Sequence, residues 1–202
     1  MDQVNQLQAF KQHVESYVLF NADEWLELEK YLTYIQLKKK DYFVEKGKVC
    51  QYFGFIAAGS VRYFNIRNDG EEITNFFSFA NELVSSYKSF VKQQPSIIYV
   101  QALEDTSLVC ISHSNIQKLT EHPLLAHKME RFGRLVAEYY LCCYEDRVQA
   151  FITQSPEERY VELLKDGQDV LQRIPQHYVA NYLGVTPVSL SRIRKRIFIP
   201  AK

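Results

Sequence analysis

The C-terminal part of the chain carries side chains of types that can form contacts with phosphates and base edges. The candidates lie within one short stretch: Thr186, Pro187, Val188, Ser189, Ser191, Arg192, Arg194, Lys195 and Arg196. From Val170 to Lys202 the chain has basic residues and no acidic one, although its overall net charge is zero. This asymmetry predicts a local anion-binding surface on an otherwise acidic protein.

Each candidate type suits a different contact with a nucleic acid. Arg192 is predicted to read a base, because its guanidinium matches O6 and N7 of guanine, with Ser189 as a second hydrogen-bonding reader. Pro187 and Val188 offer only apolar contact, for instance to a thymine methyl. Thr186 at a helix N-terminus favours a phosphate. The remaining basic residues are predicted to contact phosphates: Arg194, Lys195 and Arg196.

Catalytic and metal-binding patterns are absent from the sequence. The histidines are scattered, without the HExxH spacing of a zinc protease: His13, His113, His122, His127 and His177. The cysteines show neither CxxC nor a zinc-type Cys/His spacing: Cys50, Cys110, Cys142 and Cys143. They are interpreted as small buried hydrophobic residues in a reducing cytoplasm, with a redox or iron–sulfur role as the alternative. With no P-loop, GxSxG or GxGxxG either, the chain is predicted to be no enzyme and to carry no cofactor.

Two short helices around a tight turn must position the basic stretch. Val179, Ala180 and Leu183 share one face of the first helix, and Gly184 ends it. Thr186 then caps a second helix with Pro187 at its first position. Val185 and the apolar stripe of the second helix would complete a small core: Leu183, Val185, Leu190 and Ile193. This is the helix-turn-helix pattern, whose second helix lies in a DNA major groove. The alternative is an ordinary helical hairpin with a charged outer face.

The rest of the chain divides into helices, a β-rich region and one long helix. Two amphipathic helices come first, the second beginning at Asn21 with Glu24 as its capping-box partner. Short aromatic or β-branched segments then predict strands: 35–37, 42–44, 51–57, 61–66, 72–79, 97–102 and 107–111. A hairpin is expected at Asn68–Gly70 and a helical insert at 87–91. We expect a barrel or roll of about 80 residues.

A long helix is predicted from Pro123 to Ile152, after a shorter helix capped by Ser114. Apolar residues recur along it every three or four positions: Leu125, Met129, Phe132, Val136, Tyr139 or Tyr140, and Cys143. Such a stripe predicts pairing with a second copy of the chain, with packing inside one chain as the alternative. Ser155, Pro156 and Glu158 then open another helix, so 153–155 is the expected hinge.

This order of parts resembles the Crp/Fnr superfamily of bacterial transcription regulators. The resemblance rests on the turn at Gly47, on Gly59-Ser60-Val61, on Asn81-Glu82-Leu83 and on the helix-turn-helix. Its TPVSLSRIRK segment is similar to a Bacteroidetes-type variant of the recognition helix. The resemblance implies an α+β fold: an N-terminal β-roll (a double-stranded β-helix), a dimerisation helix and a winged-helix or helix-turn-helix domain. The expected bounds are 1–122 for the sensor, 123–152 for the dimerisation helix and 153–202 for DNA binding.

The ligand pocket departs from the family pattern. In members that bind cyclic nucleotides, a Gly-Glu-Leu segment holds the ribose and an Arg-Ser pair holds the phosphate. Here the tentative pocket residues are Asn81, Glu82, Leu83, Ser96 and Ile97, with asparagine in place of the glycine. No arginine lies between Arg67 and Arg131, and a lysine such as Lys88 or Lys92 lacks the planar fork. A different, unidentified small-molecule effector, or none, is expected instead of cyclic AMP or GMP.

The sequence therefore predicts a cytoplasmic homodimer that binds double-stranded DNA and regulates transcription. It would read a palindromic operator, with a degenerate effector pocket and no membrane segment, since no apolar run is long enough. The alternative is a small-ligand sensor that acts without sequence-specific DNA binding.

Overall fold

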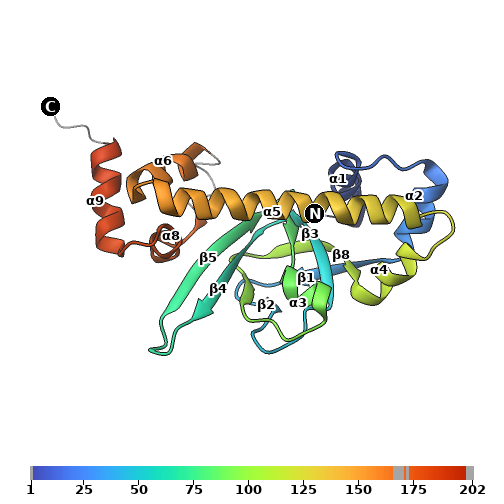
Figure 1. Ribbon diagram of the computed structural model, residues 1–202, viewed down its shortest axis with the longest axis horizontal. Coiled ribbons are helices and arrows are strands. Elements are labelled where there is room, and N and C mark those ends of the chain that lie inside the picture. Colours follow the sequence, from blue (N-terminus) through green and yellow to red (C-terminus); the bar gives the residue numbers. More distant parts are fainter. Residues whose placement is uncertain (1, 166–170, 172, 199–202) are drawn as a thin grey trace. The chain divides into compact units, whose positions relative to one another are not determined.

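The computed structural model describes residues 2–165, 171 and 173–198 of the 202-residue chain (Figure 1). Val170 and Lys202, which bound the acid-free segment, lie outside these residues. The chain forms two compact units, 1–64 with 77–139 and 65–76 with 140–202. Among the described helices, none is long and apolar enough to cross a membrane.

A β-roll of two four-stranded antiparallel sheets dominates the first unit (Figure 1). One sheet has the order β1-β8-β3-β6 and the other β2-β7-β4-β5. Their bounds are β1 Leu32–Leu37, β2 Tyr42–Val44, β3 Tyr52–Ala58, β4 Ser60–Ile66, β5 Glu72–Phe79, β6 Leu83–Val84, β7 Tyr99–Ala102 and β8 Thr106–Ser112. Each predicted strand segment overlaps one of these strands, although 51 lies outside β3 and 97–98 lie outside β7, and the roll is confirmed. The two-residue β6 was not predicted.

Strands β3 and β8 are apolar without alternation because both faces of their sheet are covered. Phe55 and Ile56 are neighbours on β3, so their side chains point to opposite faces, yet both are fully buried. Helix α1 (Gln3–Glu15) covers one face, where the ring centres of Phe10 and Phe55 lie 5.8 Å apart. Helix α2 (Ala22–Glu29) begins with the predicted Asn21–Glu24 capping box, which is confirmed.

Turns and caps set the borders of the roll. The β4–β5 hairpin closes at the predicted place, with Arg67 N–H donating to Glu71 O at 2.9 Å and Gly70 at a φ of +87°. Helix α3 (Tyr87–Lys92) is the predicted insert. Helix α4 (His113–Thr120) is capped by Ser112, whose hydroxyl accepts from Asn115 N–H. The prediction of Ser114 as this cap was wrong by two residues.

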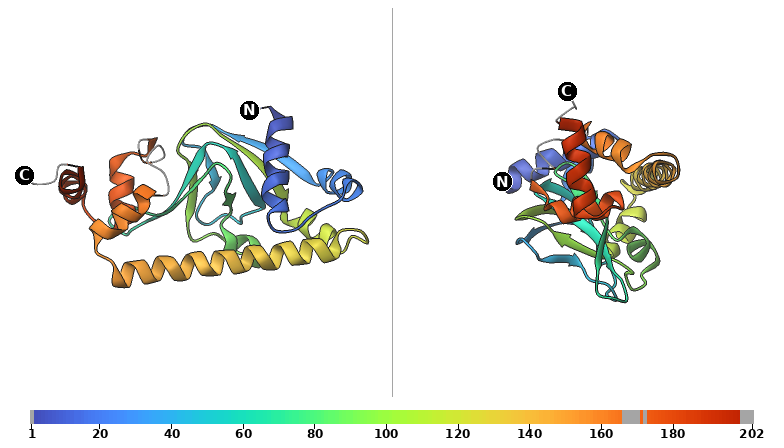
Figure 2. Two further views of the ribbon diagram at one scale, coloured as in Figure 1. Left: turned by 90° about the horizontal axis from the view of Figure 1, so that it is seen from above. Right: turned by 90° about the vertical axis from the view of Figure 1, so that its left-hand side faces the viewer.

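The first half of helix α5 (Ala126–Thr153) lies along the roll (Figure 2). Met129, Phe132 and Val136 are each at most 6% exposed, and the Phe132 ring meets Tyr17 edge-on at 5.7 Å. Lys128 also donates to Glu24 of α2 at 2.5 Å. Four residues of the stripe predicted to pair two chains, Leu125, Met129, Phe132 and Val136, are therefore buried within one chain, whereas Tyr139 is 47% exposed and Cys143 is half-buried. That part of the dimer prediction was wrong, because the roll offers an apolar face of its own.

The second unit holds helices α6 (Pro156–Lys165), α8 (Gln176–Leu183) and α9 (Pro187–Phe198). Tyr160, Val179, Ala180, Leu183, Leu190 and Ile193 form its buried core. The predicted cap of α6 is confirmed, with Glu158 N–H donating to Ser155 Oγ and Ser155 N–H donating to the Glu158 carboxylate. Between 153 and 198 the described residues contain no strand, so no wing is seen there.

Candidate nucleic-acid interface

The turn between α8 and α9 depends on a left-handed residue. Gly184 has a φ of +71°, which lets Val185 N–H donate back to Ala180 O at 3.0 Å. Thr186 then accepts from Ser189 N–H at 3.1 Å and begins α9. This local geometry agrees with the sequence prediction.

The two helices pack through small and branched residues. Ala180 is fully buried, which lets α9 approach α8 closely, and Leu190 and Ile193 of α9 are at most 5% exposed. Val185, predicted to share this core, is only half-buried. The turn itself therefore contributes less to the core than expected.

One face of α9 remains open to solvent. Val188, Ser191, Arg192 and Lys195 recur at spacings of three, one and three, which places them on a single stripe of the helix. All four are exposed, and Val188 keeps 63% of its surface accessible. In the described part of the chain, Arg192 and Lys195 make no ion pair. We call these four residues the reading stripe.

The other predicted contact residues of α9 do not share this stripe. Ser189 is half-buried, and its hydroxyl lies 3.0 Å from that of Thr186. Burial raises the pKa of Tyr160, and the nearby charge of Arg194, which is half-buried, opposes part of that shift. Arg196 pairs with Glu157 of α6. Helical spacing alone could not reveal these neighbours.

Two arginines hold the C-terminal end of α8. Arg147 donates to Tyr182 O at 2.7 Å, and its guanidinium lies 3.6 Å from the Tyr182 ring centre. Arg159 donates to Leu183 O at 2.8 Å. Cations are favoured at this end of a helix, where carbonyl groups have no helical partner. Burial lowers the pKa of Arg147.

A carbonyl group at the start of β5 also contacts α8. The Asn181 amide donates to Glu72 O within the same compact unit. Sequence analysis identified neither this contact nor the two arginines. Each of these contacts joins residues at least 24 positions apart, so no local pattern predicts it.

At the predicted ligand pocket, Glu82 serves the local backbone. Asn81 takes a left-handed φ of +71°, which asparagine tolerates, so it replaces the glycine conformationally. The Glu82 carboxylate accepts from Phe79 N–H at 3.0 Å. Leu83 is buried and pairs with Phe55, whereas Ile97 is 63% exposed. These four residues therefore do not form one lining.

Ser96 lies in a network of buried hydroxyls. Its Oγ lies 2.8 Å from Ser86 Oγ and donates to Ile98 O at 2.7 Å. Nearby, Ser89 Oγ donates to Gln94 O and accepts from Cys50 N–H. Ser96 is only 3% exposed. Its hydroxyl thus has protein partners where the family pattern would place a phosphate.

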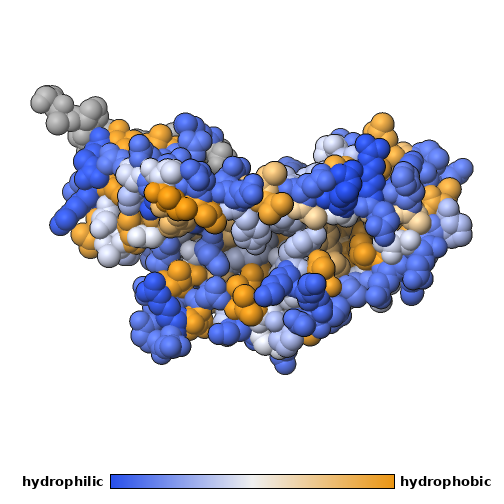
Figure 3. Space-filling model, in the orientation of Figure 1, coloured by the Kyte–Doolittle hydropathy of each residue, from blue (hydrophilic) through white to orange (hydrophobic). Residues whose placement is uncertain are grey.

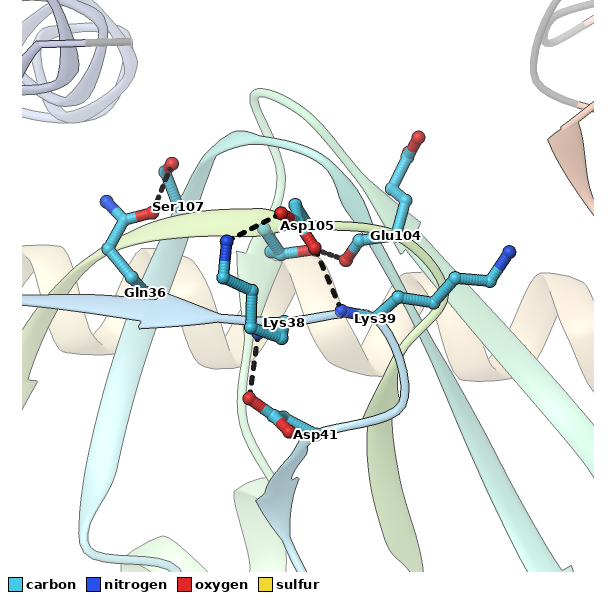
Figure 4. Close-up of polar contacts among 8 residues, drawn as sticks. Gln36, Lys38, Lys39, Asp41, Glu104, Asp105 and Ser107 are labelled. Atoms are coloured by element: carbon cyan, nitrogen blue, oxygen red, sulfur yellow. Dashed lines mark hydrogen bonds and ion pairs between the residues drawn. The ribbon is translucent and has the colours of Figure 1, made fainter.

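A second basic run, at Lys38–Lys40, belongs to the turn between β1 and β2 (Figure 4). Lys38 Nζ lies 2.9 Å from Asp105, and Lys39 N–H donates to the same carboxylate. Asp41 accepts from Lys38 N–H at 2.8 Å. The aspartates organise the loop and neutralise part of its charge, so this run is a weaker anion site than α9.

The described residues contain no group of three or more metal-ligating side chains. Cys50 and Cys110 are buried inside the roll, and burial raises the pKa of the Cys110 thiol. A thiol of this kind is poorly reactive, since the thiolate is the nucleophile. The prediction that all four cysteines are buried was wrong for Cys142, which is exposed, and Cys143 is half-buried.

Residues 34–122 match the cyclic nucleotide-binding domain family. No curated protein sequence matches the chain significantly. Among solved structures, FixK2 from Bradyrhizobium japonicum shares the fold with a TM-score of 0.68 and 17% identity, covering 83% of this chain and 84% of its own.

Two further structures show the same fold. The c-di-GMP responsive global regulator CLP of Xanthomonas campestris has a TM-score of 0.67 and 14% identity, covering 88% of this chain and 92% of its own. The Thermus thermophilus catabolite activator protein has a TM-score of 0.53 and 20% identity, covering 90% and 85%. Such structural neighbours are Crp/Fnr-family regulators, so the resemblance predicted from the sequence is confirmed.

Proposed function

We propose that this chain is a homodimeric, sequence-specific DNA-binding transcription regulator. The observation that carries the proposal is the reading stripe of α9, which combines exposed apolar, hydroxyl and basic side chains on one helix face. A helix of this kind, preceded by α8 and a tight turn, suits the helix-turn-helix role. Residues 153–202 would bind DNA, 1–122 would form the sensor and 123–152 the dimerisation helix.

The stripe divides naturally into base and phosphate contacts. Arg192 has no carboxylate partner among the described residues and offers its fork to guanine O6 and N7. Val188, near the helix N-terminus, suits a thymine methyl. Ser191 replaces Ser189 as the hydroxyl reader in this proposal, because Ser189 is occupied by the cap. Lys195 would contact a phosphate of the DNA backbone.

A second copy would pair through the other half of α5. Leu141, Tyr144, Val148 and Phe151 recur at the heptad spacing of a coiled coil and are 43–63% exposed. Figure 3 shows apolar side chains gathered along this part of the helix. We call these four residues the seam. Two such dimer-related α9 helices would read two half-sites about 34–36 Å apart.

The roll is proposed to be a degenerate effector domain. Ser96 and Glu82 form hydrogen bonds within the protein, and no arginine lies between Arg67 and Arg131 to fill the family's phosphate-binding position. CLP, which shares the fold, is described as responsive to c-di-GMP. An effector of this chain would differ from cyclic AMP or GMP.

Binding to random duplexes tests the proposal. Wild-type protein should enrich one motif, and Arg192→Ala should cost about 1–3 kcal/mol of operator affinity and relax preference at one position in each half-site. Arg134→Ala, an exposed arginine of the other compact unit, is the matched control. If Arg192→Ala enriches the same motif as wild type, the proposed position of α9 in the DNA major groove is wrong.

The second candidate is a small-ligand sensor without DNA binding. It is favoured by the extent of the family match, which covers the roll and leaves α6, α8 and α9 outside. Failure of wild-type protein to retain any duplex at low salt would favour this candidate over the first.

A further inference from the structure

The cations of α9 differ in what surrounds them. Arg192 and Lys195 have no ion-pair partner within the described residues, whereas Arg196 makes two hydrogen bonds to one oxygen of Glu157. Its Nε and Nη2 donate to Glu157 Oε2 at 3.0 and 2.5 Å. Arg196 lies one turn beyond Arg192, so a free Arg196 would stand next to the reading stripe.

The acid comes from the first turn of α6, where two glutamates have different tasks. Glu158 completes the cap: its carboxylate accepts from Ser155 N–H at 2.7 Å and from the Ser155 hydroxyl at 2.8 Å. These hydrogen bonds, the backbone one first, lower the pKa of Glu158. Glu157 takes no part in the cap and faces α9 instead.

The Glu157–Arg196 ion pair contributes little to the stability of the fold. The side chains are 39% and 59% exposed, and ion pairs this open to water contribute little to stability. Their larger effect concerns the charge that α9 presents. An arginine held by a carboxylate attracts a phosphate less, and the carboxylate itself repels one.

We propose that Glu157 is a specificity-determining residue that withholds Arg196 from the DNA backbone. This inference rests on the proposed function and extends it to a residue outside α9. Phosphate contacts supply most sequence-independent affinity, whereas base contacts supply discrimination. When Glu157 neutralises Arg196 at the edge of the reading stripe, affinity for DNA of any sequence falls. The base contact of Arg192 then supplies a larger fraction of the binding free energy.

The test compares Glu157→Gln with Glu158→Gln. Both variants remove one negative charge from the same helical turn, and glutamine still serves the capping box at 158. Binding is measured by fluorescence anisotropy on the enriched duplex and on a shuffled duplex, between 50 and 200 mM salt. Arg196→Ala and the double variant Glu157→Gln/Arg196→Ala complete the cycle.

Glu157→Gln should bind the shuffled duplex more tightly than wild type, and its affinity should depend more steeply on salt. The slope of log K against log salt should steepen by about 0.9 for each Arg196 that gains a phosphate, or about 1.8 for a dimer. The ratio of specific to shuffled affinity should fall. Glu158→Gln should show only the general effect of a lost charge, and Arg196→Ala should abolish the response to Glu157→Gln.

Three results would overturn the inference while leaving the proposed function standing. They are equal salt slopes for the two glutamine variants, weaker shuffled-duplex binding by Glu157→Gln, and a Glu157→Gln effect that survives in Arg196→Ala. Wild-type protein that binds neither duplex would instead overturn the proposed function and this inference with it.

Discussion

Single residues decide which groups of this protein remain available to a ligand. Within the part of the chain that the structure describes, Arg192 and Ser191 are exposed and have no ion pair or cap, whereas Ser189 and Arg196 on the same helix are engaged by the protein. In the roll, Ser96 and Glu82 are likewise engaged by neighbouring hydroxyl and backbone groups. A residue type at a family position is therefore a weaker predictor of binding than its hydrogen-bond partners.

The state of Ser96 leads to a prediction about cyclic AMP. A ligand present at a hundred times its dissociation constant stabilises the folded state by about 2.7 kcal/mol. Because the Ser96 hydroxyl is buried and already paired, cyclic AMP at about 100 µM should leave the melting temperature unchanged in differential scanning fluorimetry. An upward shift that saturates in the micromolar range, and that is lost in Ser96→Ala, would contradict the pocket assignment.

Sequence and structure agree best where the signal is local. Gly184, Thr186 and Pro187 predict the α8–α9 turn because a left-handed residue, a cap and a first-turn proline each act within a few residues. The choice of Ser112 over Ser114 was missed because two hydroxyls two residues apart satisfy the same pattern. The engagement of Arg196 by Glu157 was invisible because the partners are separated by 39 residues.

At the scale of elements, α8 and α9 are held by contacts at the ends of helices. Gly184 joins them, and a Cβ at this position would meet Phe151 Cε1 at 3.4 Å. Arg147 and Arg159 bind the last carbonyls of α8. The orientation of the recognition helix therefore depends on residues that do not touch DNA in our proposal.

Gly184 provides a direct test of this dependence. Gly184→Ala should destabilise the protein by about 1–2 kcal/mol, because an L-residue is strained at a φ of +71°. Urea unfolding measures the loss, and operator affinity should fall with it. Gly184→Asn is the control, since asparagine tolerates the left-handed region. Equal stability of Gly184→Ala and wild type would show that the turn does not constrain the helices.

The limit of sequence analysis is clearest in α5. Periodicity identified an apolar stripe at Met129, Phe132 and Val136, but it could not tell whether the roll or a second chain covers that stripe. Packing against the roll and packing against a second chain require the same residue types at the same spacing. The structure assigns these residues to the roll and leaves Leu141, Tyr144 and Val148 exposed.

In the whole molecule, reading a palindromic operator requires two copies of the chain. Most soluble oligomers are symmetric, and a symmetric dimer presents two α9 helices to a palindromic operator. The exposed seam supplies a surface for such a dimer, whereas the buried first half of α5 supplies stability to one chain. The two halves of this helix are thus expected to respond differently to substitution.

Val148→Glu and Phe132→Ala separate these two roles. Val148→Glu places a charge on the seam and should give monomers by sedimentation velocity, with loss of operator binding. Phe132→Ala should remain dimeric but lose about 3–5 kcal/mol of stability, because it leaves a cavity in the core. Leu26→Glu, which changes another exposed apolar residue, controls for surface charge. If Val148→Glu remains dimeric, the seam is not the dimer interface.

The most direct test of sequence-specific DNA binding is a ratio of two dissociation constants. One is measured on the duplex enriched from a random library and the other on a shuffled duplex of the same composition, both at about 150 mM salt. We expect a ratio of at least about 10³ in favour of the enriched duplex, with two inverted half-sites protected in footprinting. A ratio near one would contradict sequence-specific binding, because binding would then depend on phosphate charge alone.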